Sequence, residues 1–362
     1  MAIIIGIHNL YLCIPKGHIM RNRSITIKER PGAISSQVQI GQTANTAAAA
    51  NLFQDYMERK AGNTRARYIQ ALNGFGIFLN TLGYKNQGMT EPTEWGGITF
   101  GLIEAYKRAQ LQEGYSISTT NQNTYIIKAF AKLAAQAEII PAEEIIKIQG
   151  IKGYKSSEAA HINEQRTQAG NATRIGSKKE HSTVITREQA KALKAQPTDT
   201  LQGKRNALLM ALLLDHGARI SEVISLKGDD IDILNKTVVF HRTKTNRIDK
   251  HYLTADSLQA AKVYFDSVKP APGKSIWIGI NKKGDVSGSF GKLAAQKTVK
   301  ALGREIGIEI SCHDCRHYYA TAAHRAGSSS LDIMRAGGWA SPAMLSRYIE
   351  PDQIQNINIR LE

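Results

Sequence analysis

The stretch ISCHDCRHYYATAAHRAG, residues 310–327, contains three histidines, two arginines and two cysteines. The Cys-x-x-Cys spacing of Cys312 and Cys315 is typical of zinc sites and of thiol–disulfide exchange. Zinc would need two further ligands, and the third cysteine of the chain lies far away in the sequence. On a helix, residues three positions apart share a face, so His313 and Arg316 would point in one direction together. The stretch therefore has a second interpretation, in which this pair carries the chemistry.

Four short stretches in the C-terminal half of the chain matter together. They are HGARISEVISL with Arg219, RTKTNR with Lys244, HDCRH with His313 and Arg316, and GGWASPAMLSRYIE with Trp339 and Tyr348. In this order, with Tyr348 nine residues after Trp339, they resemble the tyrosine recombinase family, the phage-type integrases. The resemblance covers roughly residues 45–350. One such motif would be weak evidence, whereas all of them in order are specific.

The resemblance implies strand cleavage by Tyr348, which would form a 3′-phosphotyrosine intermediate. A phenol has an unperturbed pKa of about 10, so it needs help to lose its proton, and His313 is the best candidate for a general base. Arg219 and Arg316 would hold the two non-bridging oxygens of the phosphate, because a guanidinium is always charged and forks onto phosphate.

The resemblance also implies that Lys244, at the turn of a β-hairpin, protonates the leaving 5′ oxygen. Arg242, Arg247 and Lys250 lie on the same hairpin, and Lys244 is preferred because TKTNR is similar to the lysine turn of the family. Trp339 stands where the family more often has histidine. Because an indole N–H can only donate, Trp339 would support the phosphate without exchanging protons.

Other residues of these stretches have supporting or unassigned roles. Glu222, three residues after Arg219, is expected to brace that arginine. Cys315 occupies a position where the family commonly has leucine, which suits a small buried hydrophobic residue. His317 and His324 receive no role. No cofactor and no metal is expected.

Apolar periodicity predicts a helical N-terminal domain and a second domain with a hairpin at residues 237–255, joined by a polar linker. The first domain is expected to have four helices, with the pattern starting at Thr43 and the second helix capped by Asn63. Linker cations such as Arg166 could lie along phosphate. The expected division is an N-terminal extension of uncertain order (1–42), a helical core-binding, SAM-like DNA-binding domain (43–149), a basic linker (150–182), a catalytic domain (183–350) and a C-terminal tail (351–362).

The formal net charge of the 362 residues is +16. Such an excess attracts polyanions, so double-stranded DNA is the expected partner. No long apolar span points to a membrane, and the opening MAIIIGIHNLYLCIPKG lacks the basic n-region and the cleavage site of a signal peptide. Three cysteines without a disulfide framework fit a reducing cytoplasm.

The sequence thus predicts a mainly α protein, with an all-helical core-binding domain and a mostly helical, mixed α/β catalytic domain that has a small β-hairpin sheet. Together they would form a clamp around DNA. The resemblance implies site-specific, metal-free recombination by a homo-tetramer, with room for accessory DNA-bending proteins, and the tail could dock on a neighbouring protomer. Two alternatives stay open: a type IB topoisomerase, which uses the same phosphotyrosine chemistry, and a DNA-binding regulator that keeps the fold without catalysis.

Overall fold

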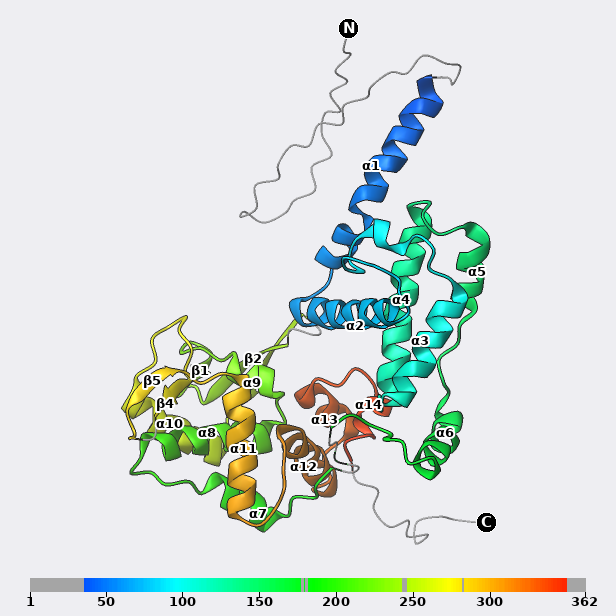
Figure 1. The fold of residues 1–362 in the computed structure, drawn as a ribbon. Helices are drawn as coiled ribbons and strands as arrows, with labels where there is room; N and C mark the ends of the chain where they lie inside the picture. Colours follow the sequence, from blue (N-terminus) through cyan, green and yellow to red (C-terminus); the bar gives the residue numbers. More distant parts are fainter. Residues whose placement is uncertain (1–35, 177–178, 180–181, 243–245, 282, 350–362) are drawn as a thin grey trace, which may run out of the picture. The chain divides into compact units, whose positions relative to one another are not determined.

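The computed structural model describes residues 36–349 except 177–178, 180–181, 243–245 and 282 (Figure 1). The chain divides into two compact units, Met1–Ser177 and Lys178–Glu362. Helices dominate both units, and the strands of the second unit form two small antiparallel sheets. The predicted mainly α fold with a small hairpin sheet is therefore confirmed. No helix in the described part of the chain is long and apolar enough to cross a membrane.

The first unit is built around helix α4, against which α2, α3 and α5 pack. Its core is aromatic, because the buried Trp95 ring contacts the rings of Phe53, Phe75 and Phe130. The indole N–H of Trp95 donates to the carbonyl of Met89 (2.9 Å), so the buried polar group is satisfied. The elements are α1 (Ser36–Glu58), α2 (Gly62–Thr81), a 3₁₀ turn η1 (Pro92–Trp95), α3 (Phe100–Gln112), α4 (Ile117–Gln136), α5 (Ala142–Gly150) and α6 (Ser156–Gln168).

Two helix starts differ from the sequence prediction. Helix α1 begins at Ser36 and not at Thr43. The segment between them shows no apolar period, yet its glutamines and the alanines that follow it favour helix by intrinsic propensity. Helix α2 is preceded by Ala61 at its N-cap position, and Asn63, the predicted cap, lies inside the first turn.

Helix α6 lies within the segment predicted as a linker. Few of its residues are apolar, and it is held instead by Arg166, whose side chain is buried. The Arg166 guanidinium donates to the carbonyls of Tyr115 (3.1 Å), Ala172 and Thr173 (3.4 Å). These contacts fold the end of α6 back onto its own unit. Arg166 is therefore a structural cation, which corrects the expectation that it lies along phosphate.

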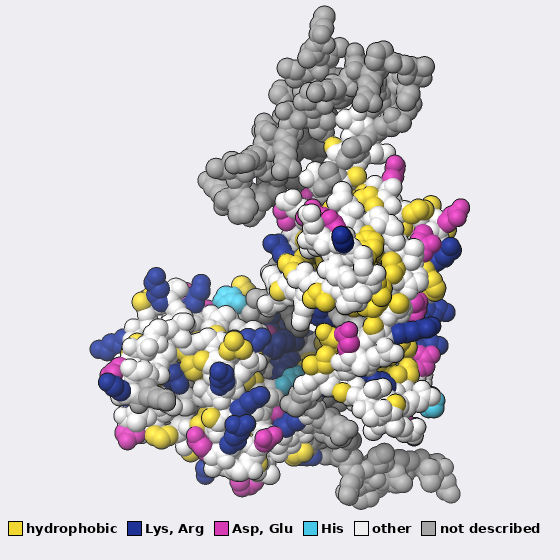
Figure 2. Space-filling model, in the orientation of Figure 1, with side chains coloured by type: hydrophobic (Ala, Val, Ile, Leu, Met, Phe, Trp, Pro, Cys, Tyr) yellow, Lys and Arg dark blue, Asp and Glu magenta, His cyan; other side chains and the backbone are white. Residues whose placement is uncertain are grey.

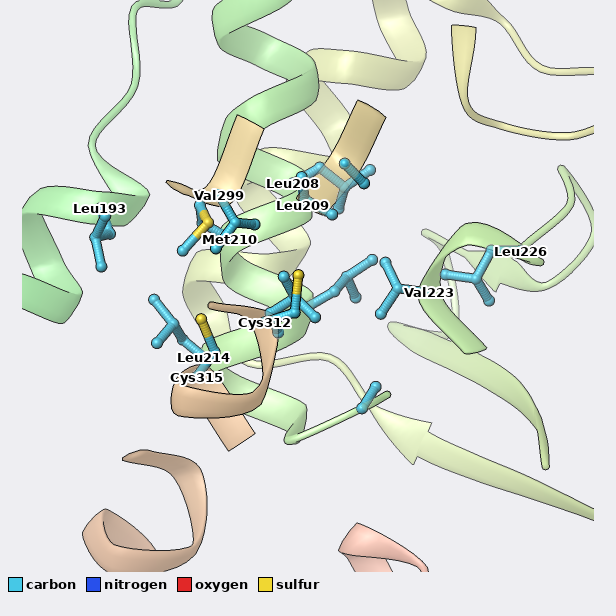
Figure 3. Packing of buried hydrophobic residues seen from close by; sticks show 14 of the residues in the cluster. Leu193, Leu208, Leu209, Met210, Leu214, Val223, Leu226, Val299, Cys312 and Cys315 are labelled. Carbon is cyan, nitrogen blue, oxygen red and sulfur yellow. The ribbon is translucent and has the colours of Figure 1, made fainter. Parts of the chain in front are cut away.

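The second unit packs around helix α8, whose stretch 207–214 is continuously apolar, as in a buried helix (Figure 3). Helices α7, α10 and α12 contact it, and Cys312 and Cys315 of α12 lie in the same core as Leu214 and Val299. The helices are α7 (Arg187–Lys194), α8 (Leu201–His216), α9 (Ile220–Ile224), α10 (Ala255–Val268), α11 (Lys292–Glu305), α12 (Cys312–Arg325), α13 (Ser330–Gly337) and α14 (Pro342–Leu345).

The larger sheet has the order β1-β2-β3 and contains the predicted hairpin. Strands β2 and β3 pair antiparallel from Thr237 opposite Tyr252 to Arg242 opposite Arg247. The inward face of β2 presents Val238, Phe240 and Arg242 to the interior, so one charged residue occupies a core position. The strands are β1 (Ile231–Asp232), β2 (Thr237–Arg242), β3 (Arg247–Tyr252), β4 (Ile278–Ile280) and β5 (Val286–Ser289).

Candidate active site

The ring of Tyr348 is surrounded by aromatic and cationic side chains. Its centroid is 5.1 Å from the ring of His313, 4.6 Å from that of His317 and 5.0 Å from that of Trp339. The guanidinium carbon of Arg316 lies 5.4 Å from the same ring. The structure thus places three of the other five sequence-predicted site residues, His313, Arg316 and Trp339, around this phenol, although they come from two separate stretches of the chain.

Short helix α14 positions Tyr348. Ser341 caps this helix by accepting a hydrogen bond from the backbone N–H of Met344 (3.3 Å), and the Tyr348 N–H donates to the carbonyl of Leu345 (2.8 Å). The Tyr348 carbonyl accepts from the hydroxyl of Thr321 on α12 (3.2 Å). The nucleophile candidate is therefore attached at its backbone to the helix that carries His313 and Arg316.

Helix α12 presents two faces with different chemistry. Ser311 and Asp314 form a capping box at its start, since Asp314 accepts from the Ser311 N–H (2.7 Å) and Ser311 accepts from the N–H of His313 (3.3 Å). The Asp314 carboxylate also accepts from the Thr183 N–H (2.9 Å). The cysteine face is buried in the core, while His313 and Arg316 face Tyr348.

The two cysteines behave as small hydrophobic residues. Cys315 is fully buried and Cys312 nearly so, and burial raises the pKa of the Cys312 thiol to about 11 and that of the Cys315 thiol well above its usual value. A raised pKa disfavours the thiolate that zinc binding requires. Among the residues that the structure describes, no three or more His, Cys, Asp or Glu side chains converge as metal ligands do.

Arg316 is almost completely buried beneath Tyr348. Its guanidinium donates to the carbonyls of Gly217 and Gly337 (2.6 Å), and its Nε–H has no acceptor among the described residues. Burial and, next, the neighbouring charge of Arg219 lower its pKa to about 10, which still leaves it charged at neutral pH. A buried cation with an unused donor is suited to an anion that enters the site.

Arg219 precedes helix α9 and is held by Glu222. The Glu222 carboxylate accepts from the Arg219 backbone N–H (2.9 Å) and pairs with its Nη1 (2.8 Å), which confirms the predicted brace. Arg219 Nη2 also donates to the carbonyl of Gly338 (3.3 Å). About a quarter of the Arg219 side chain remains exposed, so this guanidinium can meet a phosphate from solvent.

The C-terminus of helix α13 gathers the arginines of the site. The carbonyls of Gly337 and Gly338 accept from Arg316 and Arg219, and the carbonyl of Ala336 accepts from Arg242. These are the last carbonyls of a helix, where the helix dipole places partial negative charge and favours cations. The helix end thus sets where the positive charges of the site lie.

Glycine is required at this helix end for two different reasons. A Cβ on Gly337 would lie 1.7 Å from Cζ3 of Trp339, so either the indole or the helix end would have to shift. Gly338 has φ +64°, a left-handed conformation that terminates α13 and turns the chain toward Trp339. The sequence GGW therefore brings the indole onto the end of the helix.

Trp339 lies between Arg316 and Tyr348. Its ring is 3.9 Å from the Arg316 guanidinium carbon and is arranged edge-on to the Tyr348 ring. The side chain is buried, and the indole Nε1–H has no acceptor among the described residues. A buried donor without a partner is costly, by roughly 1–3 kcal/mol, so this N–H is suited to an acceptor supplied by a ligand.

Both histidines beside Tyr348 are disposed to be neutral. Burial, together with the charges of Arg316 and Arg219, lowers the pKa of His313, against the opposing effect of Asp314. Burial and the neighbouring His313 lower the pKa of His317. A neutral imidazole can accept a proton, as a general base must.

His317 was given no role by the sequence, although its ring lies against Tyr348 and 4.9 Å from that of His313. The signal was present in the spacing, because residues four apart on a helix share a face and His317 is four residues after His313. The sequence also did not reveal the contacts of Arg242, whose partners come from distant segments.

Lys244 falls in residues 243–245, outside the described part of the chain, and its role stays a prediction. The hairpin ends that flank it are described. Arg242 is buried and its donors are engaged, whereas Arg247 is exposed and pairs with Asp249 (3.0 Å). Arg242 is therefore not available to protonate the leaving oxygen, the role that the sequence assigned to Lys244.

The arrangement has matches among known proteins. Residues 183–354 match the model of the phage integrase family. Curated relatives include tyrosine recombinase XerC of Bifidobacterium longum strain DJO10A, which is 26% identical over 171 residues, or 43% of this chain and 47% of the relative. The chain thus spans about half the length of that relative. Tyrosine recombinase XerC of Mycobacterium sp. strain KMS is 22% identical over 305 residues, or 82% of this chain and 91% of the relative.

Solved structures share the fold at low sequence identity. A lambda integrase dimer bound to a COC′ core site matches with a TM-score of 0.56 at 14% identity, covering 87% of this chain and 83% of that one. The Tn1549 transposon integrase in complex with transposon right end DNA matches with a TM-score of 0.55 at 14% identity, covering 84% and 95%. The family match covers residues 183–354 and agrees with the order of motifs around Tyr348, so this part of the chain is assigned to the phage integrase family.

Proposed function

We propose that this chain is a tyrosine-type site-specific DNA recombinase that cleaves and rejoins strands through a covalent bond between Tyr348 and a 3′ phosphate. The observation that carries the proposal is the position of the Tyr348 ring. The ring lies beside His313, whose lowered pKa favours the neutral form that can act as a base. Arg316 and Trp339 next to it each carry one N–H donor that has no acceptor in the described chain. Unused donors around a phenol suit a phosphate that arrives with the substrate.

Cleavage would be an in-line displacement at phosphorus. The Tyr348 oxygen attacks, the bond from phosphorus to the 5′ oxygen breaks, and a 3′-phosphotyrosine and a free 5′ hydroxyl form. His313 takes the phenol proton, and Lys244 gives a proton to the departing 5′ oxygen. Arg219, Arg316 and Trp339 hold the non-bridging oxygens as charge moves onto them, and one preorganised donor of this kind is worth roughly 10²–10³ in rate.

Rejoining is the reverse of this step with a different 5′ hydroxyl. The phosphotyrosine keeps the energy of the broken phosphodiester, so neither a nucleotide cofactor nor a metal is needed for the exchange. The two guanidiniums supply the positive charge that other phosphoryl-transfer sites obtain from metal ions.

The partner in this proposal is double-stranded DNA. Figure 2 shows Lys and Arg side chains spread over the visible face of the second unit. Helix α11 contributes exposed Lys292, Lys297 and Lys300. Strand exchange between two duplexes further calls for four protomers, and both units of each would hold the duplex as a clamp. The tail, residues 351–362, lies outside the described part of the chain. Its docking on a neighbouring protomer, any accessory DNA-bending protein and a cytoplasmic location remain parts of the proposal.

The proposal can be tested although the target sequence is not known. The chain is incubated with a pool of randomised duplexes that carry a nick close to the scissile position, so that the short 5′-hydroxyl fragment diffuses away and traps the covalent intermediate. Denaturing gels should show a protein–DNA adduct that is absent with Tyr348→Phe and unaffected by EDTA. Sequencing the trapped strands identifies the site.

Three results would contradict the proposal. An adduct that persists with Tyr348→Phe assigns the nucleophile elsewhere. Trapped strands without a shared sequence, together with relaxation of supercoiled plasmid by the monomer, favour the topoisomerase alternative. No adduct from any pool would leave a DNA-binding regulator as the best interpretation.

A further inference from the structure

Arg242 is a charged residue at a core position of strand β2. Its side chain is 1% exposed, and it shares the inward face of the strand with Val238 and Phe240. Burying a cation is costly unless counter-charges and hydrogen bonds compensate, so the contacts of this side chain must account for its place.

All five N–H groups of the Arg242 guanidinium have an acceptor. Nε pairs with Asp249 (2.8 Å), and Nη1 pairs with Glu222 (2.7 Å) and donates to the carbonyl of Gly337 (3.3 Å). Nη2 donates to the carbonyl of Ala336 and lies 3.4 Å from Nε2 of His251. Burial and the Arg242 charge lower the pKa of His251 to about 4, so the imidazole is neutral and can accept. Arg242 therefore has no donor left for a phosphate.

Two of the partners of Arg242 also hold the arginines that would face the phosphate. Glu222 pairs with Arg242 through Oε2 and with Arg219 through Oε1 (2.8 Å). The Gly337 carbonyl accepts from both Arg242 and Arg316 (2.6 Å). One buried guanidinium thus contacts a group bonded to Arg219 and a group bonded to Arg316.

We propose that Arg242 is a positioning residue, which fixes Glu222 and the end of helix α13 so that Arg219 and Arg316 present their free donors to one phosphate. This inference rests on the function proposed above. Without Arg242, Oε2 of Glu222 keeps only its hydrogen bond from the Arg219 backbone N–H (2.9 Å). The carboxylate can then rotate and draw the Arg219 guanidinium away from the substrate. The end of α13 also loses its attachment to the hairpin.

The same contacts connect the hairpin to the site. Arg242 is the last residue of β2 and lies two residues before Lys244, the candidate acid. Its pair with Asp249 on β3 joins the two strands next to the turn. Losing Arg242 would therefore disturb both the phosphate clamp and the base of the lysine turn, while the surface that binds DNA keeps its other cations.

The experiment separates positioning from simple stability. Arg242→Met keeps most of the apolar stem and removes the guanidinium, and Arg242→Lys restores a charge with fewer donors. The control is Arg205→Met, because Arg205 is also a buried cation. Its contacts, to Asn206, to the Ile278 carbonyl (3.2 Å) and over the Phe290 ring (3.9 Å), do not reach the site. Each variant is assayed for thermal melting, duplex affinity and single-turnover cleavage at saturating DNA.

Arg242→Met should cleave at least about tenfold more slowly at saturating DNA, with duplex affinity nearly unchanged, because small misplacement of catalytic groups can lower rates by up to about 10²-fold. Arg242→Lys should recover part of the rate. Arg205→Met should melt at a lower temperature and yet cleave at the rate of the unaltered chain. The nicked duplex is the sequence recovered from the trapped pool.

A double-mutant cycle tests the route through Glu222. If Arg242 acts by holding that carboxylate, Glu222→Gln and Arg242→Met should slow cleavage by much less in combination than the product of their separate effects. Effects that simply multiply would overturn this route, and so would an Arg242→Met variant that cleaves at the unaltered rate or loses as much rate as Arg205→Met. Failure of the unaltered chain to form any adduct would overturn the proposed function and this inference with it.

Discussion

The indole of Trp339 covers the guanidinium of Arg316, with the arginine carbon 3.9 Å from the ring centroid. Both side chains are buried, and each carries one N–H group without an acceptor in the described chain. Stacking of a cation on an aromatic face is favourable by roughly 0.5–2 kcal/mol, and it keeps the guanidinium plane in one orientation. In the proposed function, the pair would form one side of the phosphate site before any substrate is present.

Substitutions at Trp339 should have graded effects on cleavage. Trp339→His keeps a donor and part of the ring, so substantial cleavage should remain. Trp339→Phe keeps the stacking surface and loses the donor, and the loss of one hydrogen bond to a charged oxygen should cost about 1.5–3 kcal/mol, or tenfold or more in rate. Trp339→Ala loses both and also leaves Tyr348 unsupported.

The measurement for this series is single-turnover cleavage of the nicked duplex, with folding checked by thermal melting. A Trp339→Phe variant that matches the unaltered chain, beside an inactive Trp339→Ala variant, would show that packing is the whole role of the indole. In that case Trp339 would leave the set of catalytic residues.

Gly337→Ala should damage the site through sterics alone. The added Cβ would lie 1.7 Å from the Trp339 ring, so the indole must move off Arg316 or the helix end must shift. Overpacking of this kind typically costs about 1–3 kcal/mol, and cleavage should fall with stability. Gly291→Ala is the control, because a Cβ there meets nothing within 4 Å. Unchanged melting and cleavage in Gly337→Ala would show that the indole is not fixed at this position.

Local spacing made the face of α12 predictable from the sequence. His313 and Arg316 are three residues apart, so any helix through them puts both on one side, and the helix is favoured by the cap at Ser311. The same reasoning applied to His317 would have placed it beside Tyr348. The core position of Cys315 follows from the same geometry, since Cys315 directly precedes Arg316 and successive helix residues point in different directions.

Contacts between distant segments were not predictable in this way. Arg242 appeared in the sequence as one of several hairpin cations, and its partners Glu222, Asp249 and Ala336 lie on three other elements. Nothing in the spacing along the chain shows that one carboxylate is shared by two arginines. Helix α6 escaped prediction for a related reason, because its stability comes from one buried arginine and not from an apolar stripe.

Acid should destabilise the second unit from about pH 6.5 downward. Burial lowers the pKa of His216 to about 3 and that of His251 to about 4. In the folded chain both are therefore neutral, whereas in the unfolded chain they bind protons below their ordinary pKa of about 6.5. Because the unfolded state then holds more protons, the free energy of unfolding should fall by up to about 1.4 kcal/mol per pH unit for each histidine until the folded pKa is reached.

Urea unfolding between pH 7.5 and 4.5, at equal ionic strength, measures this slope. His216→Gln should make it shallower, because glutamine does not titrate and can still bond the hydroxyl of Ser257, which lies 3.1 Å from His216 Nε2. His313 and His317 contribute with the same sign, since their pKa values are also lowered. If His216→Gln leaves the slope unchanged, the loss of stability in acid arises from groups other than His216.

Arg219 and Arg316 should matter for cleavage far more than for binding. Non-specific affinity comes from the many cations of a chain with a formal net charge of +16, so Arg219→Ala should keep most duplex affinity while cleavage falls by roughly 10²-fold or more. Arg316→Lys is the matching change at the buried position, because alanine there would remove the donor to the Gly217 carbonyl and leave the Gly337 carbonyl with Arg242 alone. A lysine keeps the charge but cannot reach both carbonyls and the phosphate at once.

Lys300→Ala should instead affect binding more than cleavage, since Lys300 is an exposed cation on α11 away from Arg219 and Arg316. Its loss should weaken binding slightly, more at low salt than at high salt, and leave the rate at saturating DNA unchanged. Affinity and single-turnover rate are measured on the same nicked duplex over a range of salt concentrations. If Arg219→Ala loses affinity and rate in equal proportion, as a plain phosphate contact would, then the guanidinium binds the ground state and the transition state equally, and its place in the clamp on the scissile phosphate is wrong.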